Sequence, residues 1–340
     1  MELYAGMDLH SRNTLVGVID SSLKRVFERR VPNDLSLIVA TLEPFSSELE
    51  GIVIESTYNW YWLVDGLMDA GYSNVRLANP SAIKQYEGLK HRDDRHDAFW
   101  LAHLFALGIL PEGYIYPKED RPVRDLLRKR SFLVKHRTAH ILSLQSMLER
   151  EKGYKLSGNE IKRLKAEDIA RIFSQEHLVM SAQANRSSIE FLGHHIKRIE
   201  KAVRNRVKLS KSFEYLLTVP GIGDILALTI MLEVGEIARF ARVGNFASYA
   251  RCVSSQRLSD GKKKGQGNRK NGNRYLAWAF VEASHHARRY NEGLRSYYQS
   301  KCAKRNKAVA TKAVCNKLAR ACYYIIRDQV PFREEALFCS

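Results

Sequence analysis

The sequence has few cysteines, and none of them occur in a spacing typical of a metal site. Five cysteines are present among 340 residues, and no CxxC pair occurs. An odd count without such pairs excludes a zinc-ribbon motif and a disulfide framework as expectations, and it fits a reducing compartment. Long hydrophobic runs are lacking too, because runs such as ILALTIML from Ile225 are too short to span a bilayer. With no signal peptide recognisable, we expect a cytoplasmic protein without a membrane partner.

Acidic residues are also in short supply. The chain has 55 Lys and Arg against 37 Asp and Glu, a formal net charge of +18. Hydrophobic residues make up 45% of the chain, so a folded core is expected. An excess of positive charge on a folded protein favours a polyanionic partner, and nucleic acid is the usual one.

The first hundred residues alternate strand and helix patterns. Three consecutive strand patterns are followed by a helix, a short buried strand, a second helix and a further strand. The expected strands cover residues 3–10, 13–20, 24–31, 51–56 and 74–79. A helical pattern then runs from Asp94 to Gly108. This order predicts an α/β sheet with an antiparallel edge, which is the order of ribonuclease-H-like folds.

The remainder of the chain has helical patterns. A polar segment at 111–121 precedes a highly charged region in which residues 123–150 and 187–207 carry apolar side chains at three-to-four spacing. This spacing predicts two long helices, either a coiled coil between domains or an ordinary helical subdomain. We therefore expect an α/β plus all-α protein with three domains. Their expected bounds are 1–115, 116–210 and 211–340.

Four acidic residues of the first domain are candidates for a common site. Asp8 ends the first expected strand and Glu55 the fourth, while Asp94 and Asp97 lie three apart at the start of a helix. Carboxylates that converge at one end of a sheet are costly unless a cation binds there, and hard divalent ions prefer oxygen ligands. Each acid taken singly also has an ordinary explanation, such as a turn, an ion pair or a helix cap.

Two glycines separate two apolar helical patterns near residue 220. The segment Pro220-Gly221-Ile222-Gly223 exposes backbone N–H groups before a helix N-terminus. Helix-hairpin-helix elements contact a phosphate backbone in this way, so Gly221 and Gly223 are candidate nucleic-acid contacts. A tight structural turn would have the same sequence.

A basic, glycine-rich stretch follows, SDGKKKGQGNRKNGNR at 259–274, which has no apolar side chain. We expect a loop that is mobile on its own and becomes ordered on a phosphate strand. Its candidate contacts, with one residue just before it, are Arg257, Lys262, Lys263, Lys264, Arg269, Lys270 and Arg274. From chemistry alone, Ser259 is either a phosphate-binding hydroxyl or a nucleophile whose transition state the cations would stabilise.

These motifs resemble the IS110/IS1111 family of insertion-sequence transposases, in particular its IS1111-like branch. YAGMDLH, GIVIES and DDRHDAFWLAHL resemble the N-terminal nuclease-like domain of that family. LLTVPGIGDILALTIMLEVGEIARF and SDGKKKGQGNRKNGNRYLAWAFVEA resemble its C-terminal transposase domain. The resemblance covers both ends of the chain, and the helical middle adds little to it.

The resemblance implies a RuvC-like N-terminal domain whose acidic tetrad binds Mg²⁺ or Mn²⁺. The tetrad falls on Asp8, Glu55, Asp94 and Asp97, and the family pattern selects Asp94 over the adjacent Asp93. The serine of the family falls on Ser259. The usual Ser-Ser-Gly or Ser-Asn-Gly is here Ser259-Asp260-Gly261, and Ser254 and Ser255 lie just upstream.

The resemblance also implies partners and an outcome. A noncoding bridge RNA encoded by the element pairs with donor and target DNA, and base pairing supplies the specificity. The protein, a homodimer that assembles to a tetramer, cuts and rejoins the DNA through a covalent 5′-phosphoserine. Two other functions are alternatives, and the first would use the same tetrad. One is a Mg²⁺-dependent endonuclease of the Holliday-junction type acting by hydrolysis, and the other is a non-catalytic nucleic-acid scaffold.

Overall fold

The computed structural model describes residues 2–83, 94–207, 210–253, 257–265 and 271–338. The chain divides into two compact units, Met1–Lys118 and Glu119–Ser340. Each is described by itself below. No helix in the described ranges is long and apolar enough to cross a membrane.

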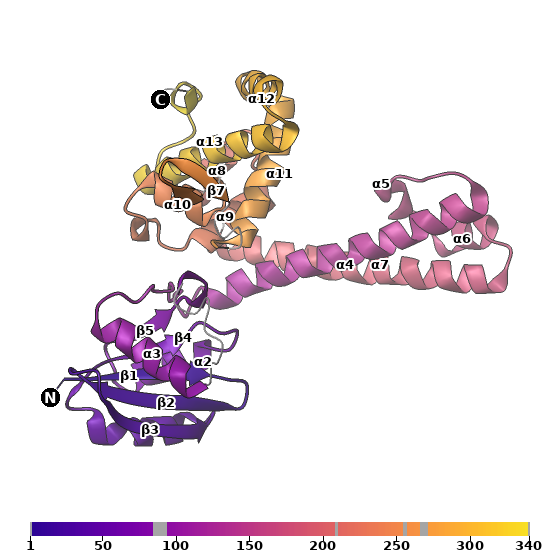
Figure 1. Cartoon of the computed structure of the whole chain (residues 1–340). Coiled ribbons are helices and arrows are strands. Elements are labelled where there is room, and N and C mark those ends of the chain that lie inside the picture. Colours follow the sequence, from indigo (N-terminus) through magenta and orange to yellow (C-terminus); the bar gives the residue numbers. More distant parts are fainter. Residues whose placement is uncertain (1, 84–93, 208–209, 254–256, 266–270, 339–340) are drawn as a thin grey trace. The chain divides into compact units, whose positions relative to one another are not determined.

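The first unit is built on a five-stranded mixed sheet with the strand order β3-β2-β1-β4-β5 (Figure 1). The five strands lie where the sequence predicted them. Strands β1, β2 and β3 pair antiparallel, whereas β4 and β5 run parallel to β1. Their bounds are Leu3–Leu9, Asn13–Asp20, Arg25–Pro32, Leu49–Glu55 and Val75–Ala78.

Alternating side chains of the strands build a core on each face of the sheet. On β4, Ile52 and Ile54 pack with helices α1 (Leu35–Leu42) and α2 (Tyr61–Asp69). The intervening Val53 packs on the opposite face with residues of α3 (Asp94–Ala106). This period of two decides which strand residues face α3. Short 3-10 turns at Glu43–Phe45 and Pro80–Ala82 complete the unit.

The second unit begins with two long helices that pack along each other, α4 (Arg121–Lys152) and α7 (Glu176–Val207) (Figure 1). Residues buried on α7 recur at every seventh position, at Ala182, Ile189, Ile196 and Val203. This repeat is the one that keeps the seam of a coiled coil facing its partner helix. The short helices α5 (Gly158–Ile161) and α6 (Ala166–Ile172) pack on the far end of the pair. Helix α7 begins at Glu176, ahead of the predicted start near residue 187.

The rest of the second unit is mainly helical around one apolar core. Helices α9, α11 and α13 contribute most of the buried side chains, among them Leu228, Phe280 and Leu318. A two-stranded hairpin, β6 (Arg257–Ser259) and β7 (Lys262–Gly265), precedes α11. The helices are α8 Lys211–Leu217, α9 Asp224–Val234, α10 Val243–Tyr249, α11 Arg274–Tyr290, α12 Glu292–Lys304, α13 Lys307–Asp328 and α14 Glu335–Phe338. A 3-10 turn at Ile237–Arg239 lies between α9 and α10.

Candidate active site

The ends of two neighbouring parallel strands bring Asp8 and Glu55 together. The register pairs Met7 of β1 with Ile54 of β4, so the next residue on each strand is one of the two acids. Met7 and Ile54 face the core under α1 and α2, so Asp8 and Glu55 point to the α3 face. Asp8 is buried and Glu55 half-buried, and their side chains share a hydrogen bond.

Helix α3 brings a third carboxylate, Asp97, to the same place. Its first turn lies over the sheet, and a side chain at Gly6 of β1 would collide with the backbone of Ala98 and Ala102. Glycine at position 6 therefore lets the helix backbone rest directly on the strand. Asp97, which precedes Ala98, lies near enough to Glu55 for its charge to act on it. Close packing thus places the third acid of the predicted set beside the first two.

The shared location changes the protonation of Glu55. Burial and the neighbouring Asp8 raise the pKa of Glu55 to about 7, with a smaller contribution from Asp97, while His10 acts in the opposite direction. A carboxyl group titrating this high signals that the site concentrates negative charge that its own residues do not fully neutralise. A bound cation would remove that cost.

His10 is a member of the site that the sequence reasoning missed. Its Nε2 lies 3.2 Å from Oδ2 of Asp8. The backbone carbonyl of His10 accepts hydrogen bonds from the side-chain amides of Asn33 at 2.9 Å and Asn59 at 3.1 Å. The signal was present in the sequence, because Asp8 and His10 are two apart on an extended segment and so share a face.

The fourth predicted acid is only partly covered by the described residues. Asp94 is the first residue of α3, but its side chain lies outside the described part, as does the whole of Asp93. Within the described side chains, no group of three or more His, Cys, Asp and Glu residues is arranged to hold a metal ion. The roles of Asp8, Glu55, Asp94 and Asp97 as a metal-binding tetrad remain predictions.

Ser259 lies in the second unit, at the end of the first strand of the β6–β7 hairpin. It is exposed and pairs with Lys262 across the hairpin. The expectation of a loop was wrong for residues 259–265, which belong to this hairpin. The two turn residues, Asp260 and Gly261, have φ angles of 51° and 67°. Two positive φ values suit the type I′ turn, for which Asp-Gly is a strong sequence signal.

The lysines of the hairpin present charge next to the serine. Lys262 and Lys264 are exposed, as expected of phosphate contacts. The side chains of Arg257 and Lys263 lie outside the described part, and so do Arg269, Lys270 and the alternative serines Ser254 and Ser255. Arg274 begins α11 and places its guanidinium 4.9 Å from the ring centroid of Tyr275.

The chain segment that carries Ser259 is joined at its two ends, Arg251 and Gly272, by hydrogen bonds. Arg251, at its start, donates from Nε and Nη2 to the carbonyl of Gly272, at its end, at 3.0 and 2.7 Å. The carbonyl of Arg251 accepts from Lys312 of α13. Gly272 has a φ of 87° and packs against the backbone of Tyr249, where a side chain would not fit. The segment therefore leaves the helical core from a fixed base.

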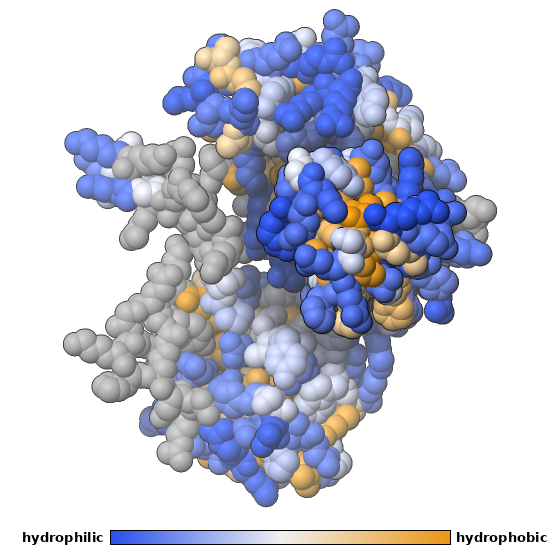
Figure 2. Space-filling model, turned by 90° about the vertical axis from the view of Figure 1, so that its right-hand side faces the viewer, coloured by the Kyte–Doolittle hydropathy of each residue, from blue (hydrophilic) through white to orange (hydrophobic). Residues whose placement is uncertain are grey.

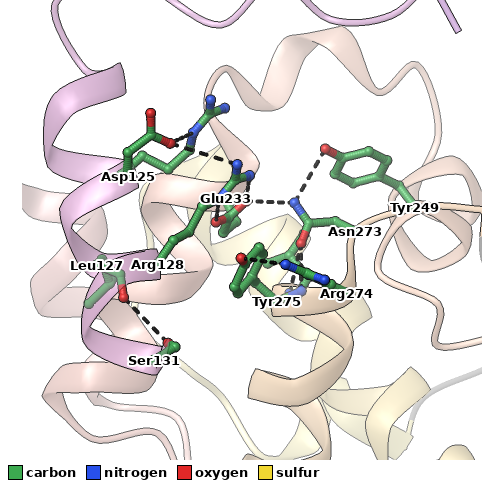
Figure 3. Close-up of polar contacts among 11 residues, drawn as sticks. Asp125, Leu127, Arg128, Ser131, Glu233, Tyr249, Asn273, Arg274 and Tyr275 are labelled. Carbon is green, nitrogen blue, oxygen red and sulfur yellow. Dashed lines mark hydrogen bonds and ion pairs between the residues drawn. The ribbon is translucent and has the colours of Figure 1, made fainter. Parts of the chain in front are cut away.

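A buried carboxylate holds this base to the long helix α4 (Figure 3). Glu233 of α9 is only 3% exposed and accepts two hydrogen bonds from Arg128 of α4, at 2.6 and 2.7 Å. Its Oε2 also accepts from Nδ2 of Asn273 at 2.7 Å. Oδ1 of Asn273 in turn caps α11 by accepting from the backbone of Tyr275 and Leu276. Because the charge is paired bidentately and buried, the network resists rearrangement.

The two glycines of the α8–α9 turn have different surroundings. Gly221 has a φ of 83°, and a side chain there would collide with the backbone of Ala283 and Ala287 in α11. Packing alone thus accounts for a glycine at this position. Gly223, just before α9, has open space around it. Contact of either residue with nucleic acid remains a prediction.

Two family models of transposases match the chain. A transposase model for DEDD proteins of the IS110 type matches residues 5–151, and a model of the transposase IS116/IS110/IS902 family matches residues 213–299. Together the two matches cover the carboxylate cluster, the α8–α9 turn and the serine-bearing hairpin.

Curated relatives carry the same description. A probable family 20 transposase of Pseudomonas aeruginosa is 23% identical over 284 residues, covering 80% of this chain and 82% of the relative. The transposase of insertion sequence IS1111A from Coxiella burnetii is 23% identical, covering 76% of this chain and 73% of its own. The transposase of IS1328 from Yersinia enterocolitica is 25% identical over 146 residues, covering 42% of this chain and 44% of its own.

The fold and the matches define a DNA transposase with a DEDD-type domain. The chain belongs to the IS110/IS1111 family of insertion-sequence transposases.

Proposed function

We propose that this transposase cuts and rejoins DNA through a covalent bond between Ser259 and a 5′-phosphate, with a divalent cation held by the acidic residues of the first unit. The observation that carries the proposal is the cluster of Asp8, Glu55 and Asp97, in which burial and then the charge of Asp8 raise the pKa of Glu55 to about 7. A mixed sheet of order β3-β2-β1-β4-β5 with acids at the ends of β1 and β4 supports a RuvC-like, ribonuclease-H-like domain.

The donor set fits a hard divalent ion such as Mg²⁺. Carboxylate oxygens are the ligands such ions prefer, and the cluster carries negative charge that a cation would neutralise. Asp8, Glu55 and Asp97, with Asp94 as the fourth, would hold the ion. When bound, the ion would supply positive charge at a phosphodiester and orient its oxygens. Without it, burial and the charge of Asp8 keep Glu55 partly protonated near neutral pH, because its pKa is raised to about 7.

The proposed chemistry of Ser259 is a pair of opposite transfers. The Oγ of Ser259 forms a bond to phosphorus while the bond from phosphorus to the 3′-oxygen breaks. Ser259 loses its hydroxyl proton, and the released 3′-oxygen takes up a proton to become a 3′-hydroxyl. Rejoining reverses this, with a 3′-hydroxyl attacking the phosphoserine. Lys262 and Lys264, exposed on the same hairpin, would stabilise the negative charge that develops on the phosphate.

The partners follow from charge and surface. A net charge of +18 and the basic hairpin support DNA as the substrate and a noncoding bridge RNA as the guide. Apolar side chains exposed on the long helices support self-association to a dimer and then a tetramer. They include Phe132, Leu142, Met180 and Phe191, each at least 50% exposed. Figure 2 shows hydrophobic residues gathered on the end of the helical pair that faces the viewer.

Denaturing electrophoresis of the protein with RNA and labelled DNA tests the proposal. Wild-type protein should leave a covalent protein–DNA adduct, and Ser259→Ala should lose both the adduct and strand cleavage while still binding nucleic acid. Ser259→Cys should retain at most a trace, because a thiolate is a poor partner for a hard metal. An adduct formed by Ser259→Ala would move the nucleophile to Ser254 or Ser255.

A hydrolytic endonuclease of the Holliday-junction type is the second candidate. It is favoured by one observation, that Asp8, Glu55 and Asp97, which lie close together, all belong to the first unit. Such an enzyme would cut DNA with water and leave no adduct, and Ser259→Ala would still cleave. The same gel therefore separates the two functions.

A further inference from the structure

A groove of about 1000 Å³ lies in the second unit, lined by residues outside the carboxylate cluster and the serine-bearing hairpin. Its floor is the turn between α8 and α9, from Leu217 to Leu226. One wall is the C-terminal part of α7 and the other is the C-terminal part of α11.

The α7 wall is a row of polar and basic side chains. Lys197, Lys201, Arg204 and Asn205 all line the groove and are exposed. Their spacing of four, three and one residues places them along one face of a helix, whereas Ile196 and Val203 are buried on the other face. The helix therefore presents its charges to the groove in a line, as contact with a chain of phosphates requires.

The two acids that line the groove are already paired. Glu200 forms an ion pair with Arg130 of α4 at 2.7 Å, and Asp224 pairs with Arg204. Among the described residues, neither Lys197 nor Lys201 has an acidic partner. Two lysine charges of this wall thus remain available to an anionic ligand.

The α11 wall adds an exposed aromatic ring. His286 and Tyr290 lie four residues apart and both line the groove, and Tyr290 is 79% exposed. Ala283 and Ala287 lie on the same face of α11 as His286 and Tyr290, and they are buried where they contact the backbone of Gly221. The missing side chain at Gly221 therefore seats the turn directly on α11 and sets the width between the turn and Tyr290.

We propose that this groove binds a nucleic-acid strand, with Lys197 and Lys201 contacting phosphates and Tyr290 stacking on an unpaired base. Cations in a line beside an exposed aromatic ring are how proteins hold single strands without reading their sequence. The inference rests on the proposed function only in that the ligand is a nucleic acid. DNA and RNA share this chemistry, and the test below distinguishes them.

Fluorescence anisotropy of the full-length protein with labelled oligonucleotides tests the lysines. Single-stranded DNA, its duplex and an RNA of the same sequence are titrated at several salt concentrations. Lys197→Ala/Lys201→Ala should reduce the salt dependence for a bound single strand by about 1.4 in logarithmic slope, because two phosphate contacts are lost. Arg198→Ala/Arg206→Ala is the matched control, since it removes two exposed charges of the same helix that do not line the groove. Equal slopes for wild type and the lysine variant, or an equal loss in the control, would overturn the proposal.

Tyr290 tests the base contact separately. Tyr290→Ala should weaken binding of a single strand by about 5- to 100-fold, and Tyr290→Phe should restore it, because stacking needs the ring and not the hydroxyl. Wild-type affinity of Tyr290→Ala for both single-stranded DNA and RNA would overturn the stacking role. The nucleic acid with the larger loss identifies the natural strand. Binding is measured without cleavage, so a wild-type protein that binds but forms no adduct would contradict the proposed function and leave the groove intact.

Discussion

At the scale of single residues, Glu55 is held among like charges by the fold itself. Its pKa of about 7 lies well above the ordinary value of 4.5, mainly because of burial and then of Asp8. Between pH 4.5 and about 7, Glu55 is ionised in the unfolded chain but still largely protonated in the folded protein. The free energy of unfolding therefore falls as the pH rises through this range. The site therefore costs stability in the absence of a cation, as sites prepared for charged ligands often do.

A pH series without divalent ions should reveal this cost. Between about pH 4.5 and 7, the free energy of unfolding of the wild type should fall relative to that of Glu55→Gln, whose side chain stays neutral. The expected difference is on the order of 1–2 kcal/mol after allowance for partial exposure. Urea unfolding of both proteins with a chelator measures it. A difference that does not change with pH would show that Glu55 has an ordinary pKa.

Two adjacent aspartates separate the alternatives for the fourth acid. We expect Asp94→Ala to abolish DNA cleavage, because Asp94 is the predicted ligand of the ion. Asp93→Ala should reduce cleavage only slightly, because Asp93 is not a predicted ligand. Strand cleavage assays with both variants, with circular dichroism to confirm folding, make the comparison. A dead Asp93→Ala beside an active Asp94→Ala would reverse the assignment.

At the scale of elements, the contact of α3 with β1 determines where Asp97 lies. The contact needs glycine at position 6, because a methyl group there would meet the backbone of Ala98 and Ala102. Backbone atoms cannot move aside as a flexible side chain can, so the helix itself would have to shift.

Gly6→Ala should therefore destabilise the protein by about 1–3 kcal/mol and reduce cleavage through displacement of Asp97. Gly244→Ala is the control, since its position lies in α10 with open space and no positive φ, and it should stabilise the protein by up to about 1 kcal/mol without lowering cleavage. Thermal unfolding and cleavage rates measure the two effects. Full activity with unchanged stability in Gly6→Ala would contradict the close approach of α3.

The buried pair of Arg128 and Glu233 acts at the same scale. Glu233→Gln should destabilise the second unit by about 1–3 kcal/mol, because Arg128 and Asn273 would lose a buried charged acceptor. Asp328→Asn, which breaks the exposed pair with Arg327, should cost less than about 1 kcal/mol. Chemical unfolding of both variants makes the comparison. A small effect of Glu233→Gln would mean that the base of the serine-bearing segment is held by its other contacts.

At the scale of the whole molecule, the long helices α4 and α7 expose large apolar side chains to solvent. Phe191 and Met180 of α7 are 64% and 63% exposed. We propose that these side chains contact a second copy of the chain.

Light scattering after gel filtration should show a dimer or tetramer for the wild type and a smaller species for Met180→Ser/Phe191→Ser. The double variant should keep its helical content, because both side chains are already outside the core. Lys201→Ala serves as a surface control and should leave the mass unchanged. A wild type that elutes as a monomer at all concentrations would contradict self-association.

The sequence by itself determined the succession of strands and helices along the chain, the mainly helical character of the rest, and the candidates Asp8, Glu55, Asp97 and Ser259. Strands follow from local alternation, and strand-end acids follow from the strands, so neither needs knowledge of distant contacts. The Asp260-Gly261 turn signal of the hairpin was also present in the sequence. The high content of lysine and glycine in residues 259–274 instead favoured the prediction of a loop.

Tertiary structure alone decided how distant residues combine. The approach of α3 to β1, the pairing of Arg128 with Glu233, and the groove between α7, α11 and the α8–α9 turn join residues far apart in the chain. The raised pKa of Glu55 arises the same way, since Asp8 and Asp97 act on it only because strand register and helix packing bring them near. Such contacts depend on packing in three dimensions, whereas sequence periodicity reports only which face of an element is buried.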